Sequence, residues 1–349
     1  MNLGSICRNI AKCGEESRGK SNMKNQVLIV SFSFEQEPEA FDALRQAGLE
    51  PVLWAQAERG ENTTEQALID YWNGLPVAPA GILMGADVPV TEKFLSAVAN
   101  KPKAISLNCA GYDHLALDAL RQHGVRVCNV PRQNFSAVAD LAFGLIIALM
   151  RKIPQGDRNI RAGKWVRGIE RGMAVSGKTL GILGFGAVGR AVAKRGAGFE
   201  MNIITSDVIQ NEQAAAELGA RFVDRESLFC QSDILVVAAP ATQETHHLIN
   251  RETLALMKPS AVLINPSRGA VVDTEALTEA LETGVIAGAG LDVYEEEPLY
   301  ESALFHMENT VLTPHMGGLA DREIHNVAMQ SARNMVALLT EEGCKLDIV

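Results

Sequence analysis

The segment GILGFGAVGR, residues 181–190, places three glycines in a GxGxxG pattern midway along a chain of 349 residues. An apolar run at 179–183 precedes the glycines and a helical pattern follows them, so they are predicted to lie on a turn from strand to helix. In that setting Gly184 permits the tight turn, Gly186 lets the backbone approach a pyrophosphate, and Gly189 lets the helix pack on the strand. The helix N-terminus presents N–H groups to the phosphates. The segment therefore predicts a dinucleotide site.

An acidic residue supports this interpretation over a purely steric role for the glycines. Asp207 follows the next predicted strand, about 20 residues after the glycines, where a carboxylate can accept hydrogen bonds from an adenosine ribose. A carboxylate at this position repels a 2′-phosphate, and the adjacent Val208 and Ile209 offer no cation to offset it. We therefore expect NAD rather than NADP as the cofactor.

Length and composition limit the possible classes of protein. A chain of 349 residues predicts two domains, and the 47% hydrophobic and 21% charged content is ordinary for a globular protein. The formal net charge of −10 argues against binding to nucleic acid or to anionic membranes, and no apolar run is long enough to span a bilayer. The six cysteines lack CxxC spacing and are too sparse for a disulfide scaffold, and no metal site is expected from them. We expect a reducing cytoplasm as the location of the protein.

The first 22 residues differ from the rest of the chain. They lack the apolar region of a secretory signal, and Glu15 and Glu16 argue against a transit peptide. Met23 then precedes a clear strand pattern. We expect residues 1–22 to be a disordered extension, with the folded protein beginning near Met23.

From Met23 onward, short β-branched runs alternate with amphipathic helical patterns, which predicts parallel sheets flanked by helices. The first series has predicted strands at 27–31, 51–54, 81–84, 104–107 and 125–128, and helices at 37–47, 64–72, 92–99 and 115–123. A long helix at 135–151 separates it from the second series, whose strands are predicted at 179–183, 202–206, 234–238, 262–264, 287–291 and 310–313. A closing helix is predicted at 321–340.

Three residues suited to carbonyl reduction follow strands of the second series. In open α/β sheets, ligands bind beyond the carboxyl ends of the strands. Arg268 can bind a carboxylate and polarise a carbonyl, and His315 can donate a proton. Glu297 can raise the pKa of His315. Taken alone, Arg268 could form a surface salt bridge, His315 could be an ordinary loop residue, and Glu297 could belong to a solvated acidic run. Their shared location after strands of one sheet favours a catalytic role.

The segments GILGFGAVGR, INPSRGAVVD, GAGLDVYEEEPL and LTPHMGG resemble, in matching order, the motifs of the D-isomer-specific 2-hydroxyacid dehydrogenases. The likeness extends upstream through ISLNCAGYDHLALDAL, VCNVP and VADLAFGLIIALMRK. The resemblance implies an α/β protein in which a Rossmann dinucleotide-binding domain, 131–318, is inserted in a flavodoxin-like substrate domain, 23–130 and 319–349. It places the active site in the cleft between them, and the layout predicts hinges near Val130 and Gly318.

The resemblance also implies a function and a set of site residues. It implies NAD-dependent reduction of a small 2-oxo acid to the D-2-hydroxy acid, with Arg268, Glu297 and His315 as catalytic residues. Asp292 would hold the nicotinamide carboxamide, and backbone N–H groups of Ala110 and Gly111 would bind the substrate carboxylate together with Arg268. The expected cofactor contacts are Gly184, Gly186, Ala187, Val188, Gly189, Asp207, Pro240, Ser267, Arg268, Asp292, His315 and Gly318. A homodimer is expected, with the long helix after Pro131 contributing.

Two other functions remain open on this fold. One is a formate-dehydrogenase-like enzyme, although that group normally has glutamine at the Glu297 position. The other is a dinucleotide-sensing protein similar to the transcriptional corepressors built on this fold, which can retain all three catalytic residues. The substrate is open as well, because DHLALDAL resembles the glyoxylate and hydroxypyruvate reductases whereas LNCAG is similar to D-lactate dehydrogenases.

Other reactive residues carry weaker hypotheses. Arg132, just after NVP, could meet a second anionic group of the substrate or simply face solvent. We do not expect Cys109 to be a nucleophile, because hydride transfer needs no covalent intermediate. No metal site is predicted: His246 and His247 are adjacent, so they point apart, and no ligand cluster accompanies them.

Overall fold

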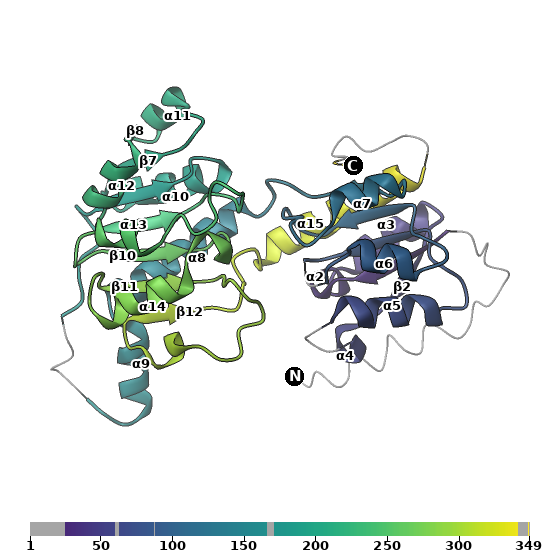
Figure 1. The fold of residues 1–349 in the computed structure, drawn as a ribbon, viewed down its shortest axis with the longest axis horizontal. Helices are drawn as coiled ribbons and strands as arrows, with labels where there is room; N and C mark the ends of the chain where they lie inside the picture. Colours follow the sequence, from purple (N-terminus) through teal and green to yellow (C-terminus); the bar gives the residue numbers. More distant parts are fainter. Residues whose placement is uncertain (1–24, 60–62, 87, 166–170, 341–347, 349) are drawn as a thin grey trace. The chain divides into compact units, whose positions relative to one another are not determined.

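The computed structural model describes residues 25–59, 63–86, 88–165, 171–340 and 348, so the predicted extension at 1–22 lies outside the described residues. The chain folds into two compact units (Figure 1). Unit 1 comprises Met1–Val130 and Ala328–Val349, and unit 2 comprises Pro131–Val327. The first crossing between units follows Val130. The second lies between Val327 and Ala328, inside the closing helix, and not near Gly318.

Unit 1 contains a five-stranded parallel sheet with the order β2-β1-β3-β4-β5. This is the strand order of flavodoxin-like folds, as the resemblance implies. Its strands are β1 (Gln26–Val30), β2 (Glu50–Leu53), β3 (Gly81–Met84), β4 (Ala104–Leu107) and β5 (Arg126–Cys128). Its helices are α2 (Phe32–Glu35), α3 (Pro38–Gln46), α4 (Gln56–Arg59), α5 (Glu65–Gly74), α6 (Glu92–Ala97), α7 (Leu117–Gln122) and part of α15 (Asp321–Leu339).

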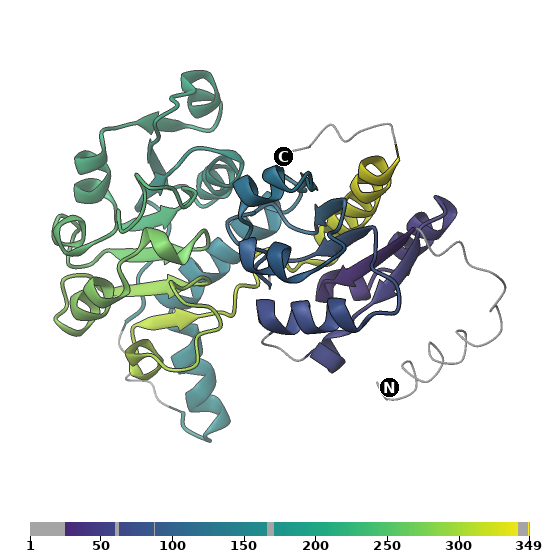
Figure 2. The same ribbon diagram turned by 45° about the vertical axis from the view of Figure 1, so that its right-hand side comes forward.

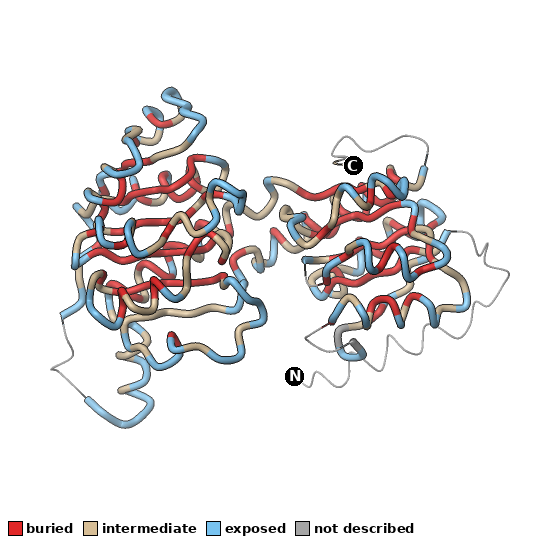
Figure 3. The backbone as a smooth tube through the Cα atoms, viewed as in Figure 1, coloured by how far each residue is buried: buried red, intermediate tan, exposed pale blue. Residues whose placement is uncertain are grey.

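The sheet of unit 1 is covered on both faces, which explains its continuous apolar strands. Helices α5, α6 and α7 pack on one face, and α3 and α15 pack on the other. Figure 3 shows the strands as mostly buried, apart from the edge strand β2, and the outer sides of the helices as exposed. Helix α15 contributes Ala328, Ala332, Met335 and Leu338, whose spacing places them on one helical face. Burial of this face therefore joins a distant part of the chain to unit 1.

Unit 2 contains a seven-stranded parallel sheet with the order β12-β11-β10-β9-β6-β7-β8. The order reverses direction between β6 and β9, which creates the switch point where dinucleotides bind in Rossmann folds. Its strands are β6 (Thr179–Leu183), β7 (Asn202–Ser206), β8 (Ala220–Phe222), β9 (Ile234–Val237), β10 (Val262–Asn265), β11 (Gly288–Leu291) and β12 (Thr310–Leu312). Its helices are α8 (Phe135–Met150), α9 (Ile153–Arg161), α10 (Ala187–Gly198), α11 (Glu212–Glu217), α12 (Arg225–Gln231), α13 (Arg251–Ala255) and α14 (Thr274–Glu282), with 3-10 turns η2 (Gly269–Val271) and η3 (Ala303–His306).

Two apolar layers hold unit 2 together. Helices α8 and α10 pack on one face of the sheet, and α12, α13 and α14 pack on the other. Helix α9, which the sequence analysis missed, has no buried residue and projects from unit 2 in Figures 1 and 2. Strand β8 was also missed, because three residues carry too short a pattern. Among the described residues, no helix has the length and apolar content needed to cross a membrane.

Candidate active site

The glycine-rich turn between β6 and α10 has the geometry that the motif predicts. Gly184 has a φ of +95°, and a Cβ there would lie 2.8 Å from the backbone nitrogen of Ala239. A Cβ on Gly189 would lie 2.1 Å from the carbonyl oxygen of Gly184. Both positions therefore require glycine, since neither backbone can move away cheaply. A Cβ on Gly186 would meet nothing within 4 Å, so space is open beside the turn.

The start of α10 fits a phosphate group. Gly186 is the N-cap residue, and no side chain accepts a hydrogen bond from the first N–H groups of the helix. Within the described residues, the backbone N–H groups of Ala187 and Val188 have no acceptor. Unpaired N–H groups and the helix dipole make such an end attractive to anions. These residues can therefore hold the pyrophosphate of a dinucleotide.

Asp207 lies directly against this turn. Its Oδ2 atom accepts a hydrogen bond from the Phe185 N–H at 2.5 Å, and its Oδ1 accepts one from the Ile209 N–H at 2.9 Å. The carboxylate is thus fixed at the end of β7 and retains lone pairs for ribose hydroxyls. The next two residues, Val208 and Ile209, are 91% and 77% exposed and carry no charge, so neither supplies a cation beside Asp207. The arrangement suits a ribose without a 2′-phosphate.

A buried asparagine positions the loop that carries Arg268. Asn265 ends β10, and its Oδ1 accepts a hydrogen bond from the Ser267 N–H at 3.1 Å. Its Nδ2 donates to the Arg268 carbonyl at 2.9 Å. Ser267 Oγ donates to the Ala239 carbonyl at 2.5 Å, which ties this loop to the one after β9. Sequence reasoning missed Asn265, although a polar residue ending a buried apolar strand is a signal that could have identified it.

His315 and Glu297 form a hydrogen-bonded pair. The Nδ1 atom of His315 lies 2.6 Å from Oε2 of Glu297, and Oε1 of Glu297 accepts a hydrogen bond from the Tyr294 N–H at 2.9 Å. His315 has a φ of +50°, a left-handed conformation that turns its side chain toward this partner. The Nε2 atom has no partner within the described residues, so it is available to a substrate.

The local charges favour the protonated form of His315. The hydrogen bond to Glu297 and the charge of that carboxylate raise the pKa of His315, although burial and Arg268 act in the opposite direction. Burial alone would raise the pKa of Glu297, but the hydrogen bond and charge of His315, with a smaller contribution from Arg268, lower it. These shifts favour the carboxylate form of Glu297 beside the imidazolium form of His315, and Arg268 is close enough to influence both groups.

Asp292 organises the loop that carries His315. Its carboxylate is 1% exposed; Oδ1 accepts hydrogen bonds from Thr313 Oγ1 at 2.6 Å and the Met316 N–H at 2.9 Å. Oδ2 accepts one from the Gly317 N–H at 2.8 Å. Its backbone carbonyl accepts a fourth from the His315 N–H at 2.8 Å. The predicted contact with a nicotinamide carboxamide stays a prediction, and the structure adds a role in positioning His315.

Tyr294 supports the same loop and was also missed. Its hydroxyl donates to the Thr313 carbonyl at 3.0 Å. Burial, followed by the charge of Asp292, raises the pKa of Tyr294 to about 12, so the phenol remains a neutral donor. A tyrosine beside an acidic run carries no sequence signal for this role, because the acceptor that ties it to the His315 loop, Thr313, lies 19 residues further along the chain.

The loop after β4 in unit 1 contains Ala110 and Gly111. Asn129 Nδ2 donates to the Ala110 carbonyl at 2.7 Å, and the buried Asn108 accepts a hydrogen bond from Ser331 Oγ at 2.9 Å. These bonds fix the loop within unit 1. Within the described residues, the N–H groups of Ala110 and Gly111 have no acceptor. They are therefore available to bind a carboxylate.

Two further residues, Pro240 and Gly318, were predicted to contact the cofactor. The Pro240 carbonyl accepts a hydrogen bond from Thr245 Oγ1 at 2.6 Å, in the loop after β9. Gly318 lies beside the start of α8, because a Cβ there would be 2.9 Å from Nδ2 of Asn134. Neither observation tests a cofactor contact, and both contacts remain predictions.

Cysteine and histidine residues outside the pair show no catalytic or metal-binding arrangement within the described part of the chain. Cys109 Sγ donates to the Gly111 carbonyl at 3.1 Å. The expectation that His246 and His247 point apart is wrong, because their rings stack with centroids 4.0 Å apart in a segment where His247 has a left-handed φ of 49°. Nε2 of His247 lies 2.5 Å from Oε1 of Glu295. Across the described ranges, no group of three or more His, Cys, Asp or Glu residues could hold a metal ion.

Comparisons with known proteins identify the family to which this chain belongs. Residues 143–317 match the family model of the D-isomer specific 2-hydroxyacid dehydrogenase NAD-binding domain. A glyoxylate reductase of Thermococcus litoralis is 41% identical over 291 residues, which cover 78% of this chain and 88% of that protein. A Thermus thermophilus crystal structure has a TM-score of 0.82 at 32% identity, covering 93% of this chain and 100% of that one. An Aquifex aeolicus D-lactate dehydrogenase complexed with NAD and lactic acid has a TM-score of 0.78 at 26% identity, covering 90% and 96%.

Proposed function

Because this chain belongs to the D-isomer-specific 2-hydroxyacid dehydrogenases, we propose that it reduces a small 2-oxo acid to the D-2-hydroxy acid, with Arg268, Glu297 and His315 as its catalytic residues. Bound NADH supplies the hydride for this reduction. The observation that carries the proposal is the His315–Glu297 pair at 2.6 Å, with Nε2 of His315 left available. The similarity to glyoxylate reductases favours glyoxylate, a small 2-oxo acid, as the substrate.

Arg268 is proposed to bind the substrate. Its guanidinium group can hold a carboxylate through two parallel hydrogen bonds and draw electron density from the adjacent carbonyl. Asn265 holds its backbone through the carbonyl oxygen at 2.9 Å, which limits where the side chain can reach. The N–H groups of Ala110 and Gly111 are proposed as further donors to the carboxylate, since neither has an acceptor within the described residues.

His315 is proposed to supply the proton that neutralises the developing alkoxide. A general acid must carry its proton at the working pH, and Glu297 provides this by raising the pKa of His315. Glu297 also fixes the ring, because its hydrogen bond with Nδ1 directs Nε2 outward. Asp292 and Tyr294 act as positioning residues, since they hold the loop around Thr313 and His315.

The test is NADH oxidation with a panel of 2-oxo acids, beginning with glyoxylate, hydroxypyruvate and pyruvate, and chiral analysis of the products. We expect turnover of at least one acid with the D-product from chiral acids. His315→Gln should lower kcat by about 10²–10⁴-fold, because it removes a general acid, and leave NADH affinity nearly unchanged. Tight NADH binding without turnover of any acid would instead support a dinucleotide sensor. Comparable turnover in His315→Gln would remove His315 from the acid role.

The homodimer implied by the resemblance is also part of the proposal. Helix α9 leaves Ile153 and Ile160 51% and 58% exposed, and none of its residues is buried. Contiguous exposed apolar patches mark protein–protein interaction sites, and the proposal is that these two isoleucines belong to a patch covered by a second copy. Light scattering should give twice the 37.6 kDa chain mass, and the double variant Ile153→Glu/Ile160→Glu should shift the protein to the monomer. A wild-type protein at the monomer mass would contradict this.

A further inference from the structure

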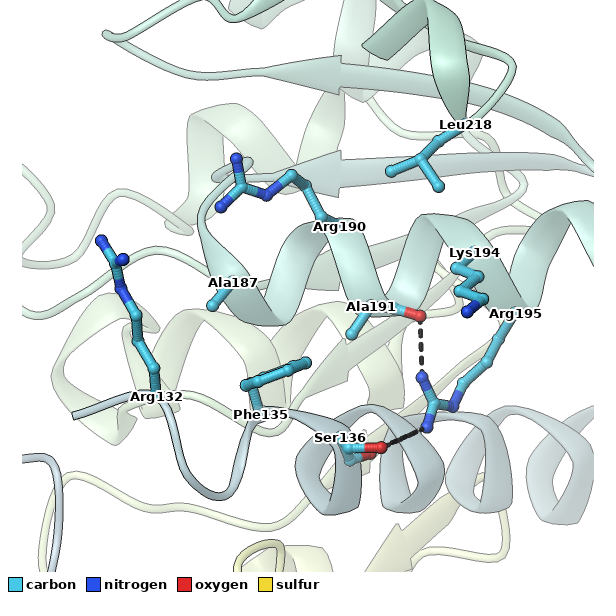
Figure 4. A pocket seen from close by; sticks show the side chains of 9 residues that line it. All are labelled: Arg132, Phe135, Ser136, Ala187, Arg190, Ala191, Lys194, Arg195 and Leu218. Atoms are coloured by element: carbon cyan, nitrogen blue, oxygen red, sulfur yellow. Dashed lines mark hydrogen bonds between the residues drawn. The ribbon is translucent and has the colours of Figure 1, made fainter. Parts of the chain in front are cut away.

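Unit 2 contains a cavity of about 700 Å³ beside the start of α10, a size typical of small-molecule sites. Figure 4 shows it between α10 and the residues that begin α8. Its floor is apolar and its rim is basic. The lining residues are Arg132, Phe135, Ser136, Ala187, Arg190, Ala191, Lys194, Arg195 and Leu218.

The basic residues of this cavity differ in whether they are paired. Arg195 is occupied: its Nε donates to Asp140 at 2.7 Å and its Nη2 donates to the Ser136 carbonyl at 3.1 Å. Within the described residues, no side-chain hydrogen bond or ion pair is formed by Arg132, Arg190 or Lys194, whereas the backbone N–H of Arg190 donates to the Gly186 carbonyl at 3.0 Å. In Figure 4 the Arg190 side chain extends toward the N-terminal end of α10, where the Arg132 guanidinium also lies. Two unpaired cations therefore lie near the uncapped end of that helix.

Arg132 has an unfavourable backbone conformation. Its φ is 61°, in the left-handed region that glycine adopts readily and arginine adopts at a cost. Such conformations persist only where the surrounding structure enforces them, and they cluster at active sites and ligand clamps. Arg132 is exposed, so its guanidinium group is accessible to a ligand.

We propose that Arg132, assisted by Arg190, binds the pyrophosphate of the dinucleotide cofactor. The pyrophosphate belongs at the start of α10, where the N–H groups of Ala187 and Val188 have no acceptor within the described residues. Ala187 has no charged side chain, and it lines the same cavity as both arginines. An arginine matches a phosphate through its planar, two-pronged donor geometry. This proposal replaces the hypothesis that Arg132 binds a second anionic group of the substrate.

The proposal rests on dinucleotide binding and does not depend on which substrate the protein reduces. Binding of NADH to the full-length protein, measured without substrate, therefore tests it. Kd values for NADH, measured by its fluorescence, are compared for the wild type and Arg132→Gly. Glycine relieves the strain at φ 61°, so we expect the Tm of the variant to equal or exceed that of the wild type. The Kd for NADH should rise about tenfold, the loss typical of one charge-assisted hydrogen bond at an exposed site.

Control variants and probes locate the interaction. Arg190→Ala should weaken NADH binding in the same direction, whereas Lys194→Ala, in the same cavity and one turn further along α10, should change Kd by less than about twofold. Arg132→Gly should weaken binding of ADP and leave binding of adenosine unchanged. An unchanged Kd for NADH in Arg132→Gly would overturn the proposal. So would a loss confined to NADPH, which would indicate the 2′-phosphate, or a rise in KM only for 2-oxo acids with a second carboxylate.

Discussion

Replacing Asp292 with asparagine tests whether this carboxylate holds the loop that carries His315. The side chain keeps its shape but loses one of its two acceptor atoms. If the amide oxygen takes the Oδ1 position, it still accepts from Thr313 and Met316, and the amide nitrogen then faces the buried Gly317 N–H, which was 2.8 Å from Oδ2. A hydrogen bond to a charged group contributes about 1.5–3 kcal/mol, and an unsatisfied buried donor costs a similar amount. We expect a net loss of about 3 kcal/mol, a large part of the stability of a typical domain.

The assay is equilibrium unfolding in urea, combined with hydrogen exchange at the Gly317 amide. The midpoint should fall, and exchange at Gly317 should accelerate. The matched control is Asp273→Asn, because Asp273 caps α14 by accepting one hydrogen bond from the Ala276 N–H at 2.9 Å. Asparagine caps helices as well as aspartate does, so this control should change stability by less than about 0.5 kcal/mol. If Asp292→Asn is no less stable than the control, the three hydrogen bonds do not hold the loop.

Two further predictions concern the proton donor and the glycine-rich turn. Reduction requires the imidazolium form of His315, and Glu297 raises the pKa of this residue, so kcat/KM should fall as pH rises through that pKa. In Glu297→Gln the fall in kcat/KM should occur at lower pH. An unchanged pH profile in this variant would contradict the role of the pair. Gly189→Ala places a Cβ 2.1 Å from the Gly184 carbonyl and should cost about 1–3 kcal/mol with loss of NADH affinity, measured by urea unfolding and NADH titration. Gly198→Ala, where a Cβ meets nothing within 4 Å, should stabilise the same helix by up to about 1 kcal/mol, and equal effects at the two positions would refute the steric argument.

Site residues could be predicted from the sequence in those places where local pattern and general topology were sufficient. Gly184 and Gly189 were predictable because a strand-to-helix turn imposes steric demands that only glycine meets. Arg268 and His315 could be placed near each other because parallel strands present their carboxyl ends at one edge of a sheet. The flavodoxin-like strand order of unit 1 came instead from the family resemblance, since alternation of strands and helices leaves the order open.

The tertiary structure decided which polar side chains meet. Asp292 and Tyr294 support the loop that carries His315 through partners about 20 residues further along the chain, and a linear sequence holds no record of those distances. The same is true of Arg132, whose strained backbone and neighbours in the cavity appear only once α8 is packed beside α10. The GxGxxG segment, together with Asp207, was enough to predict a dinucleotide site at the turn before α10. The folded chain determined which residues surround that position, because packing brings together groups that are far apart along the sequence.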